Sequence, residues 1–416
     1  MLRRYYVGSV RWLVRSQRPA AVGLVFGALA AAGCRRSSAA EKVERATLSR
    51  EESGQAQKVL TQYADIAHAA YADASRGARE LERAIAALVE TPSAERLEAA
   101  RAAWIAARRP YLQTEVYRFY GGPIDRVELA VNTWPIDENY VESGSAERPG
   151  IIENVQAYPV LDEQLLLAVN AKEGETSIST GYHVIEYLLW GKDSSLETPG
   201  SRSVGDYQPK QNALAQRRGH YLKLSAGLLV RQLEELTQAW DPGRVDNYRA
   251  EFLRMTPLSA LALVVRGMGA LSGPELAGER LTVAYETKDQ ENEHSCFSDT
   301  THQDIIFNAI GIENLCTGRY EPSHGSALQG TGLCDFVSAS APELGQRLRQ
   351  QVAASVAAAR TIPAPFDRAM QGEDTAPGRR ALQITIQSLL KQAETLSEVA
   401  ARFDLRAPRL DGRARP

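Results

Sequence analysis

The sequence has no apolar stretch beyond residue 33 that is long enough to cross a membrane. A membrane-spanning helix needs about 20 apolar residues, so we expect the body of the chain to lie outside the bilayer. Sustained alternation of apolar and polar residues, which is typical of half-buried strands, is also missing. We therefore expect no strands beyond short pieces.

The first part of the chain is basic and then briefly apolar. Five arginines precede an apolar run at 20–32, and Cys34 follows closely. This pattern is typical of a signal peptide, and the small residues before Cys34 resemble a lipoprotein cleavage site, although Ala31 stands where leucine is usual. We therefore predict a signal peptide at 1–33, a lipid on Cys34 and a tether at 34–52. Ordinary cleavage that leaves the thiol free is the alternative.

The remaining chain has an excess of acidic residues. Removing the predicted signal peptide takes away five arginines and changes the formal net charge from -3 to -8. Nucleic acid is therefore not an expected partner, because binding to phosphates depends on Lys and Arg. We expect a bacterial cell-envelope protein, in the periplasm or at the outer membrane, that contacts the membrane through its lipid only.

Cysteines are few, four in the whole chain. Beyond the predicted lipidation site there are three, Cys296, Cys316 and Cys334, and an odd number leaves one thiol free or paired between chains. Disulfides persist in an envelope compartment. Cys316 and Cys334 flank a stretch rich in Gly and Ser, so we predict that they form a disulfide worth roughly 3 kcal/mol in the chain-entropy model.

Helical patterns dominate the rest of the chain. Residues 55–89 are rich in Ala, Leu, Glu and Arg and contain no proline, which predicts a long helix. A second helix is expected to start at Ser93 and run through Trp104, with Pro110 interrupting it. Residues 121–150 are expected to form a long irregular stretch.

Two later segments have apolar residues at helical spacing, as in the seam of a helical bundle. Segment 221–236 has Leu222, Leu229, Leu233 and Leu236. The C-terminal segment has large residues every seven positions, with small or apolar residues four positions on: Leu382, Leu389, Leu396 and Phe403, with Ile386, Ala393 and Ala400. We predict an all-α fold of two helical-bundle domains, at 53–200 and 201–416, with the boundary near a break rich in Ser, Pro and Gly.

A further helix, predicted at 177–190 with Gly191 as its stop, has His183 and Glu186 three residues apart. Side chains at that spacing share a helix face, with Cβ atoms about 5 to 6 Å apart, so both could bind one metal ion. Two ligands leave a metal incompletely coordinated, and a third must then come from another segment. A hydrogen-bonded pair without metal is the alternative.

Five runs in the chain together resemble the imelysin family: RPYLQTEVYRF (109–119), GPID (122–125), WPID (134–137), GYHVIEYLLWG (181–191) and DQENEHSCFSDTTH (289–302). The resemblance covers nearly all of the chain after the signal peptide. It implies a two-domain helical fold with the Gly-x-His-x-x-Glu helix at a central site, and an envelope protein tied to iron supply. Some members are classed as metallopeptidases, whereas others look like iron-uptake proteins.

The matching runs supply oxygen and nitrogen ligands, a mixture that iron accepts, with zinc as the alternative. The expected metal ligands are His183, Glu186, Glu115, Asp137 and His294. The residues expected to contact a bound ligand are Arg118, Asp125, Trp134, Glu293 and Ser298. A structural ion pair is the alternative for the arginine, and plain packing for the tryptophan. His302 shares a helix face with His294 only if the stretch between them is helical; a turn before a helix from His302 is the alternative.

Three functions remain in competition. The first is a lipid-anchored protein that captures iron, or an iron-bearing ligand, for import together with an envelope transport partner. The second is a metallopeptidase, but neither His-Glu-x-x-His nor His-x-x-Glu-His occurs. The third is a scaffold, which does not require so many Glu, Asp and His residues in loops. We favour the binding protein.

Overall fold

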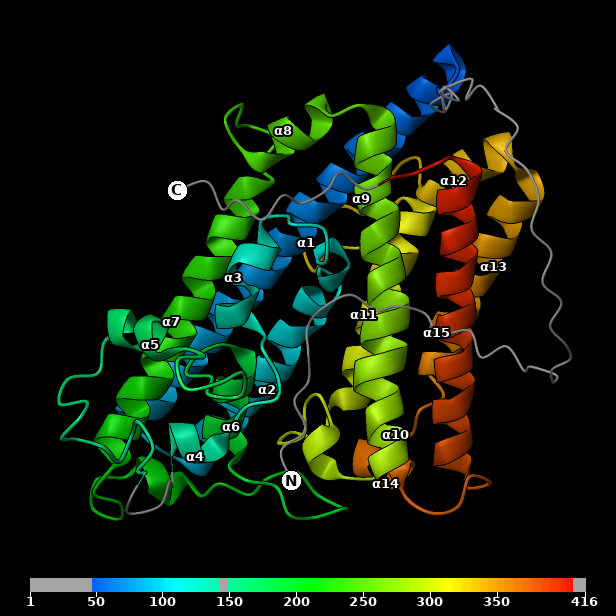
Figure 1. The fold of residues 1–416 in the computed structure, drawn as a ribbon. Coiled ribbons are helices and arrows are strands. Elements are labelled where there is room, and N and C mark those ends of the chain that lie inside the picture. Colours follow the sequence, from blue (N-terminus) through cyan, green and yellow to red (C-terminus); the bar gives the residue numbers. More distant parts are fainter. Residues whose placement is uncertain (1–46, 143–147, 407–416) are drawn as a thin grey trace, which may run out of the picture. The chain divides into compact units, whose positions relative to one another are not determined.

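The computed structural model describes residues 47–142 and 148–406 (Figure 1). The predicted signal peptide, the predicted lipidation site Cys34 and most of the predicted tether lie outside the described residues. The described residues all belong to one compact unit. Helices dominate its described part, which confirms the all-α prediction, and none of these helices is both long and apolar enough to span a bilayer. The predicted boundary near residue 200 stays a prediction.

The elements follow one another along the chain with short connections in most places. They are α1 (Arg50–Glu90), α2 (Ala94–Leu112), η1 (Glu115–Tyr117), α3 (Ile124–Val131), α4 (Glu138–Val141), α5 (Glu163–Val169), α6 (Tyr182–Trp190), η2 (Val204–Tyr207), α7 (Ala215–Ala239), α8 (Tyr248–Arg254), α9 (Pro257–Ala270), η3 (Leu271–Thr282), α10 (Val283–Thr287), η4 (Gln290–Asn292), α11 (Thr301–Thr317), β1 (Arg319–Tyr320), β2 (Leu328–Gln329), α12 (Leu333–Ser340), α13 (Pro342–Ala359), α14 (Phe366–Met370) and α15 (Pro377–Arg402). The two short strands pair antiparallel.

The long helix α1 packs against α2 and α7. It begins with a capping box, in which Ser49 and Glu52 each accept the other's backbone N–H through their side chains. A Cβ added at Gly77 would lie 3.0 Å from the Cα of Ala107, so the small residues of α1 let α2 approach closely. The predicted helix at 55–89 is confirmed and extends a few residues further at its start.

Helix α2 passes through Pro110, so the prediction that this proline interrupts the helix is wrong. Ser93 caps its start as predicted, accepting the backbone N–H of Arg96 at 3.3 Å. A proline removes one helical hydrogen bond and crowds the preceding turn. Here the loss falls near the end of the helix, which continues only to Leu112.

Both predicted seams are buried. In α7, Leu222, Leu229, Leu233 and Leu236 are all in the core. So are Leu382, Leu389 and Leu396 of α15 and Phe403 directly after it. Helix α15 packs against α13, α9 and η3. In Figure 1, α9 and α15 run beside each other along much of their length.

Three local predictions need correction. Helix α6 begins at Tyr182 rather than near Ser177, because Gly181 has φ 101° and the hydroxyl of Ser179 donates to the carbonyl oxygen of Leu166 at 2.6 Å instead of capping a helix. The stretch expected to be irregular at 121–150 contains α3 and α4. The stretch between His294 and α11 consists of turns. This confirms the alternative prediction of a turn followed by a helix near His302.

Segment η3 is a π-helix of 12 residues that lies between α9 and α10. Helices with i→i+5 hydrogen bonds are rare, and they occur frequently at functional sites. It carries Glu275 and Arg280, whose side chains pair. Cys316 of α11 and Cys334 of α12 form a disulfide, whereas Cys296 is buried and free.

Candidate metal centre

The motif helix α6 is buried along its whole length. Its first glycine, Gly181, has a positive φ that L side chains rarely adopt, and an added Cβ would lie 2.7 Å from the carbonyl oxygen of Val131. Glycine is therefore required where the chain enters α6 beside the end of α3. His183 is therefore the second residue of α6, and its side chain is buried.

His183 and Glu186 contact each other directly. Nδ1 of His183 lies 2.9 Å from Oε2 of Glu186. The other carboxylate oxygen, Oε1, accepts the backbone N–H of Ser298 at 3.0 Å and its hydroxyl at 2.7 Å. Burial raises the pKa of Glu186 to about 8. Nε2 of His183 is buried and has no hydrogen-bond partner among the described residues.

A second imidazole lies against the first. The ring centroids of His183 and His294 are 4.6 Å apart, with the planes at 72°. Nδ1 of His294 lies 2.6 Å from Oδ2 of Asp304, which also accepts from the Ser295 hydroxyl at 2.5 Å and from Arg108 at 3.1 Å. No described residue donates to or accepts from Nε2 of His294. Each imidazole is therefore held at Nδ1 by an acidic side chain, and its Nε2 makes no hydrogen bond with a described residue.

Both imidazoles are neutral at physiological pH. Burial, followed by the charge of His294, keeps the pKa of His183 well below its usual range. Burial and the charge of Arg280 lower the pKa of His294 to about 4. Neutral imidazole is the form that binds metal, and a carboxylate on the other ring nitrogen is the usual support of a metal-binding histidine.

A pocket of about 220 Å³ opens beside His294. Trp134 forms one wall, with its ring centroid 5.6 Å from that of His294. The other lining residues are mostly charged or polar: Arg118, Glu128, Asn132, Thr133, Pro135, Glu275, Glu279 and Arg280. A small anionic or chelating molecule in this pocket would contact both His294 and two guanidinium groups.

Glu115 lies behind the pocket in a charge network. Arg280 donates to both of its oxygens, at 2.7 and 2.9 Å, and Arg118 donates at 2.9 Å. The side-chain amides of Asn132 and Asn308 donate at 3.1 and 2.8 Å. Burial opposes the charge of Glu115, but Arg280 and Arg118 outweigh it and hold the pKa well below its usual range. All of its strong acceptor positions are in use.

Two other predicted residues stabilise local backbone. The carboxylate of Asp125 accepts four backbone N–H groups, from Phe119 to Gly122, at 2.6 to 3.2 Å. Asp137 caps α4, accepting the backbone N–H of Asn139 at 3.0 Å. Among the described residues, no hydrogen bond or ion pair joins either acid to the two imidazoles.

The remaining predicted residues divide between two sides of one loop. His294 contacts His183, and Ser298 contacts Glu186. The carboxylate of Glu293 has no hydrogen-bond partner among the described residues and lies near Asp367, Asp299 and Asp193. His302 is partly buried in the first turn of α11, and its Nδ1 has no partner among the described residues.

Sequence reasoning missed several residues of this centre. Asp304, Arg108, Asn132, Arg280 and Asn308 supply the charges and amides that fix His294 and Glu115. For Asp304 a signal existed, because it lies in the first turn of the helix that follows the last matching run. Arg280 has no such signal, since it is 165 residues away from Glu115.

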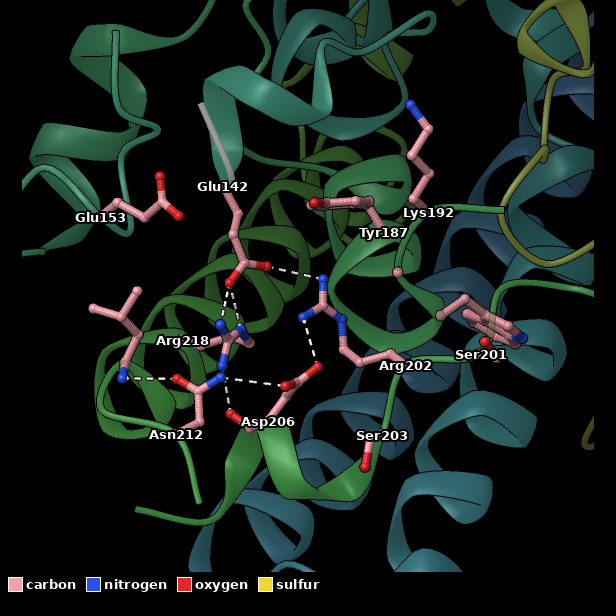
Figure 2. A pocket seen from close by; sticks show the side chains of 13 residues that line it. Glu142, Glu153, Tyr187, Lys192, Ser201, Arg202, Ser203, Asp206, Asn212 and Arg218 are labelled. Carbon is pink, nitrogen blue, oxygen red and sulfur yellow. Dashed lines mark hydrogen bonds and ion pairs between the residues drawn. The ribbon is translucent and has the colours of Figure 1, made fainter. Parts of the chain in front are cut away.

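A larger cavity, about 510 Å³, lies on the other side of α6 (Figure 2). Glu142 is at its centre, where it accepts from Arg202 at 2.9 Å and pairs with Arg218. Arg202 also pairs with Asp206 at 3.3 Å. The charges at the centre of this cavity are paired with one another, as are the arginines beside His294, but no histidine is among its lining residues.

Comparison with known proteins gives a consistent result. The imelysin family model matches residues 67–396. Iron-regulated protein A of Synechococcus elongatus is 25% identical over 307 residues, which are 71% of this chain and 73% of that protein. Two solved structures have a similar fold. One, described as an iron-regulated protein A precursor from Parabacteroides distasonis, has a TM-score of 0.67 at 17% identity and covers 86% of this chain and 98% of its own. An imelysin-like protein from Psychrobacter arcticum has a TM-score of 0.60 at 14% identity, covering 88% and 99%.

Proposed function

The chain belongs to the imelysin family, and on this premise we propose that it binds iron, as an ion or as a chelate, at the centre around His183 and His294. A relative named iron-regulated protein A fits an iron-related role. In this proposal the protein sits in the bacterial envelope, attached by a lipid on Cys34, and passes iron to a transport partner.

The observation that carries the proposal is the pair of free ring nitrogens. Nε2 of His183 is buried with no partner among the described residues, and a bound ligand is one explanation of such an unsatisfied polar atom. Two neutral imidazoles pack edge to face, and each is oriented at Nδ1 by an acidic side chain, as in metal-binding histidines. No third acid, histidine or cysteine among the described residues completes this pair within 4.8 Å, so a bound metal would need further ligands from a chelate or water. Bound iron would act as a Lewis acid for oxygen donors of a chelate.

Of the residues predicted to ligate the metal, His183 and His294 lead this proposal. Glu186 either orients His183 or becomes a ligand by giving up that hydrogen bond. Glu115 and Asp137 remain predicted ligands with other partners, since each would have to leave the contacts described above. The remaining coordination positions would be filled from the pocket by a chelate or by water. Its two arginines, Arg118 and Arg280, are already paired with glutamates.

Peptide hydrolysis is the alternative function. It would require a metal-bound water and a carboxylate free to accept its proton. Glu186 is the acid nearest to His183 by hydrogen bonding, but both of its oxygens already have partners. We therefore rank iron binding first.

The test compares metal affinity in the purified protein and single variants, His183→Ala, His294→Ala and Glu186→Gln. His324→Ala is the matched control, because this histidine is exposed and lies outside any cluster. Equilibrium dialysis with ferrous iron under anaerobic conditions, and separately with zinc, gives the dissociation constants. We expect at least a tenfold loss of affinity, about 1.4 kcal/mol, in the His variants. Far-UV circular dichroism checks that helical content is unchanged.

Wild-type affinity in folded His183→Ala and His294→Ala would refute the proposal and leave a scaffold. Cleavage of a peptide library by the wild type, lost in both variants, would favour the peptidase. Labelling with a fatty-acid analogue in the native host tests the anchor separately. Persistence of the label in Cys34→Ser would exclude lipidation at that residue.

A further inference from the structure

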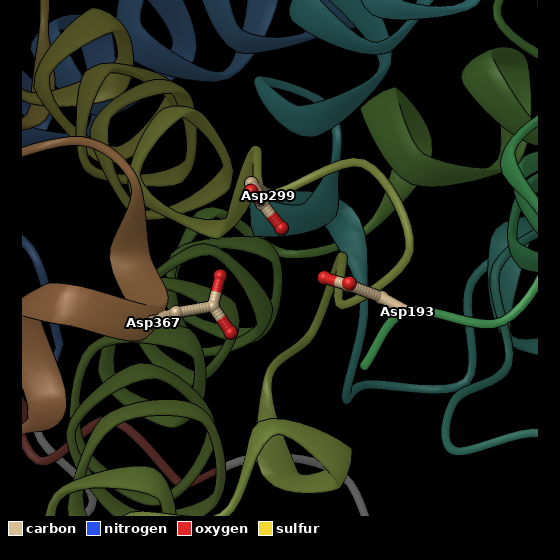
Figure 3. A group of neighbouring side chains, drawn as sticks. All are labelled: Asp193, Asp299 and Asp367. Atoms are coloured by element: carbon tan, nitrogen blue, oxygen red, sulfur yellow. The ribbon is translucent and has the colours of Figure 1, made fainter. Parts of the chain in front are cut away.

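Four acidic side chains from three separate segments meet on the opposite side of the loop that carries His294 and Ser298. Asp193 follows α6, Glu293 and Asp299 belong to the loop, and Asp367 is in α14. Figure 3 shows the three aspartate carboxylates directed toward one another. One oxygen from each aspartate lies within 4.8 Å of the other two. Oxygens on opposite sides of one calcium ion are separated by about this distance.

Several of these oxygens lack any partner. Both oxygens of Glu293, both of Asp299, and one each of Asp193 and Asp367 have no hydrogen-bond donor among the described residues. Glu293 and Asp367 are both 0% exposed. No Lys, Arg or His within the described ranges forms an ion pair with any of the four. A buried carboxylate next to like charges is costly unless a cation or a proton compensates its charge.

In Asp193 and Asp367, the oxygen that has a hydrogen-bond partner is Oδ1. The side-chain amide of Gln290 donates to Oδ1 of Asp367 at 2.6 Å and to the carbonyl oxygen of Ser195 at 2.7 Å. The backbone N–H of Ser195 donates to Oδ1 of Asp193 at 2.9 Å. In both aspartates one oxygen is fixed from outside, so that the other is left free and turned inward.

Protons shared between the acids are the alternative to a cation. Burial and the charge of Asp367 raise the pKa of Asp299 to about 9, and burial raises that of Glu293 well above its usual range. Protonation would relieve the repulsion and join the acids in pairs through shared protons. A cation would instead compensate all of the inward oxygens together, and calcium binding distinguishes the two states.

We propose that Asp193, Glu293, Asp299 and Asp367 bind one calcium ion, at a site separate from the histidine centre. The donors are oxygens only, which excludes a preference for soft metals. Calcium accepts six to eight oxygens in flexible geometry. The three aspartates, each with an oxygen within 4.8 Å of the other two, offer four unpartnered oxygens, and Glu293 beside Asp367 offers two more. Magnesium prefers to keep several waters and is less suited to a buried group of four carboxylates.

The ion would join the segment after α6, the 293–299 loop and α14. This loop carries His294 and Ser298, which contact His183 and Glu186 from its other side. Calcium would therefore hold the loop in the position that the histidine centre needs, without contacting the bound metal itself.

The test uses the whole protein after treatment with a chelator. Thermal unfolding is measured with and without millimolar calcium, and calcium content is measured by equilibrium dialysis. We expect one ion per chain and a rise in Tm of at least about 3 °C. Glu293→Gln, Asp299→Asn and Asp367→Asn should each abolish the rise. The matched control Asp246→Asn, at an exposed acid, should keep it.

Three results would overturn the proposal: no calcium response in the wild type, a response that survives in all three variants, or a magnesium response as large as that of calcium. His183→Ala should retain the full calcium response. This last comparison separates the two sites, because failure of iron binding at the histidine centre leaves the calcium result unaffected.

Discussion

Two groups of buried acids in the described part of the chain differ in what balances their charge. Glu115 is surrounded by Arg280, Arg118 and two side-chain amides, so each oxygen has donors. Glu293 lies among three aspartates and has none. A carboxylate that is fully paired inside the protein holds segments together by itself. A group of acids that face one another can do so only when something else supplies the positive charge.

The variant Glu115→Gln has the largest expected effect on stability and tests this contrast directly. The substitution keeps the shape of the side chain but leaves the buried Arg280 without its main counter-charge. We expect the free energy of unfolding to fall by about 3 to 5 kcal/mol, measured by urea denaturation. Glu321→Gln is the control, because its pair with Arg319 is exposed. A loss in Glu115→Gln no larger than in this control would mean that the network is not structural.

A third buried acid, Glu142, provides the pH test. Burial opposes its charge, but Arg202 and Arg218 lower the pKa below the ordinary 4.5. The ionised carboxylate therefore stabilises the fold above pH about 4.5, and the contribution is lost as pH falls through the lower, folded-state pKa. Glu142→Gln should cost about 2 kcal/mol at neutral pH. Urea denaturation between neutral and acidic pH should show the two proteins converging; a gap that is constant with pH would contradict the assignment.

Ser298 belongs to the loop that carries both His294 and Asp299. Its hydroxyl and its backbone N–H donate to Glu186 of the histidine centre. Ser298→Ala should weaken metal binding at the histidine centre by about tenfold, the usual size for a group that orients a ligand. Equilibrium dialysis measures this, and Ser298→Thr should restore the affinity because it keeps the hydroxyl. Equal affinity in the alanine and threonine variants would show that the hydroxyl has no positioning role.

The smallest expected effect is a gain in stability rather than a loss. In chelator, Glu293→Gln should raise the free energy of unfolding by about 1 kcal/mol, because a neutral amide removes a buried like charge. The same chemical change therefore destabilises at Glu115 and stabilises at Glu293. Urea denaturation of both variants in one buffer makes the comparison. A loss of stability at Glu293 would show that its partners were misidentified.

Features that depend on local spacing could be predicted from the sequence. The leucine seams of α7 and α15 follow from a helical repeat, and both are buried. The contact between His183 and Glu186 follows from their spacing on one helix. The family resemblance also selected His294, which lies against His183 although it is 111 positions further along the chain.

Features that depend on distant partners could not be predicted. Nothing near Glu115 in sequence indicates that Arg280 and Asn308 neutralise it. Asp137 is a predicted metal ligand, and the structure adds that its carboxylate caps the start of α4. The sequence identifies which acids are present, whereas the fold determines which of them already have donors.

The π-helical segment η3 has a consequence for the charge network around Glu115. Glu275 and Arg280 are five residues apart, which in an α-helix places them about 140° apart around the axis. The wider i→i+5 register brings them onto one face, where Arg280 reaches both Glu275 and Glu115. In ordinary α-helical register the same two residues would point to different sides of the helix, and Arg280 could not join Glu275 and Glu115 in one network.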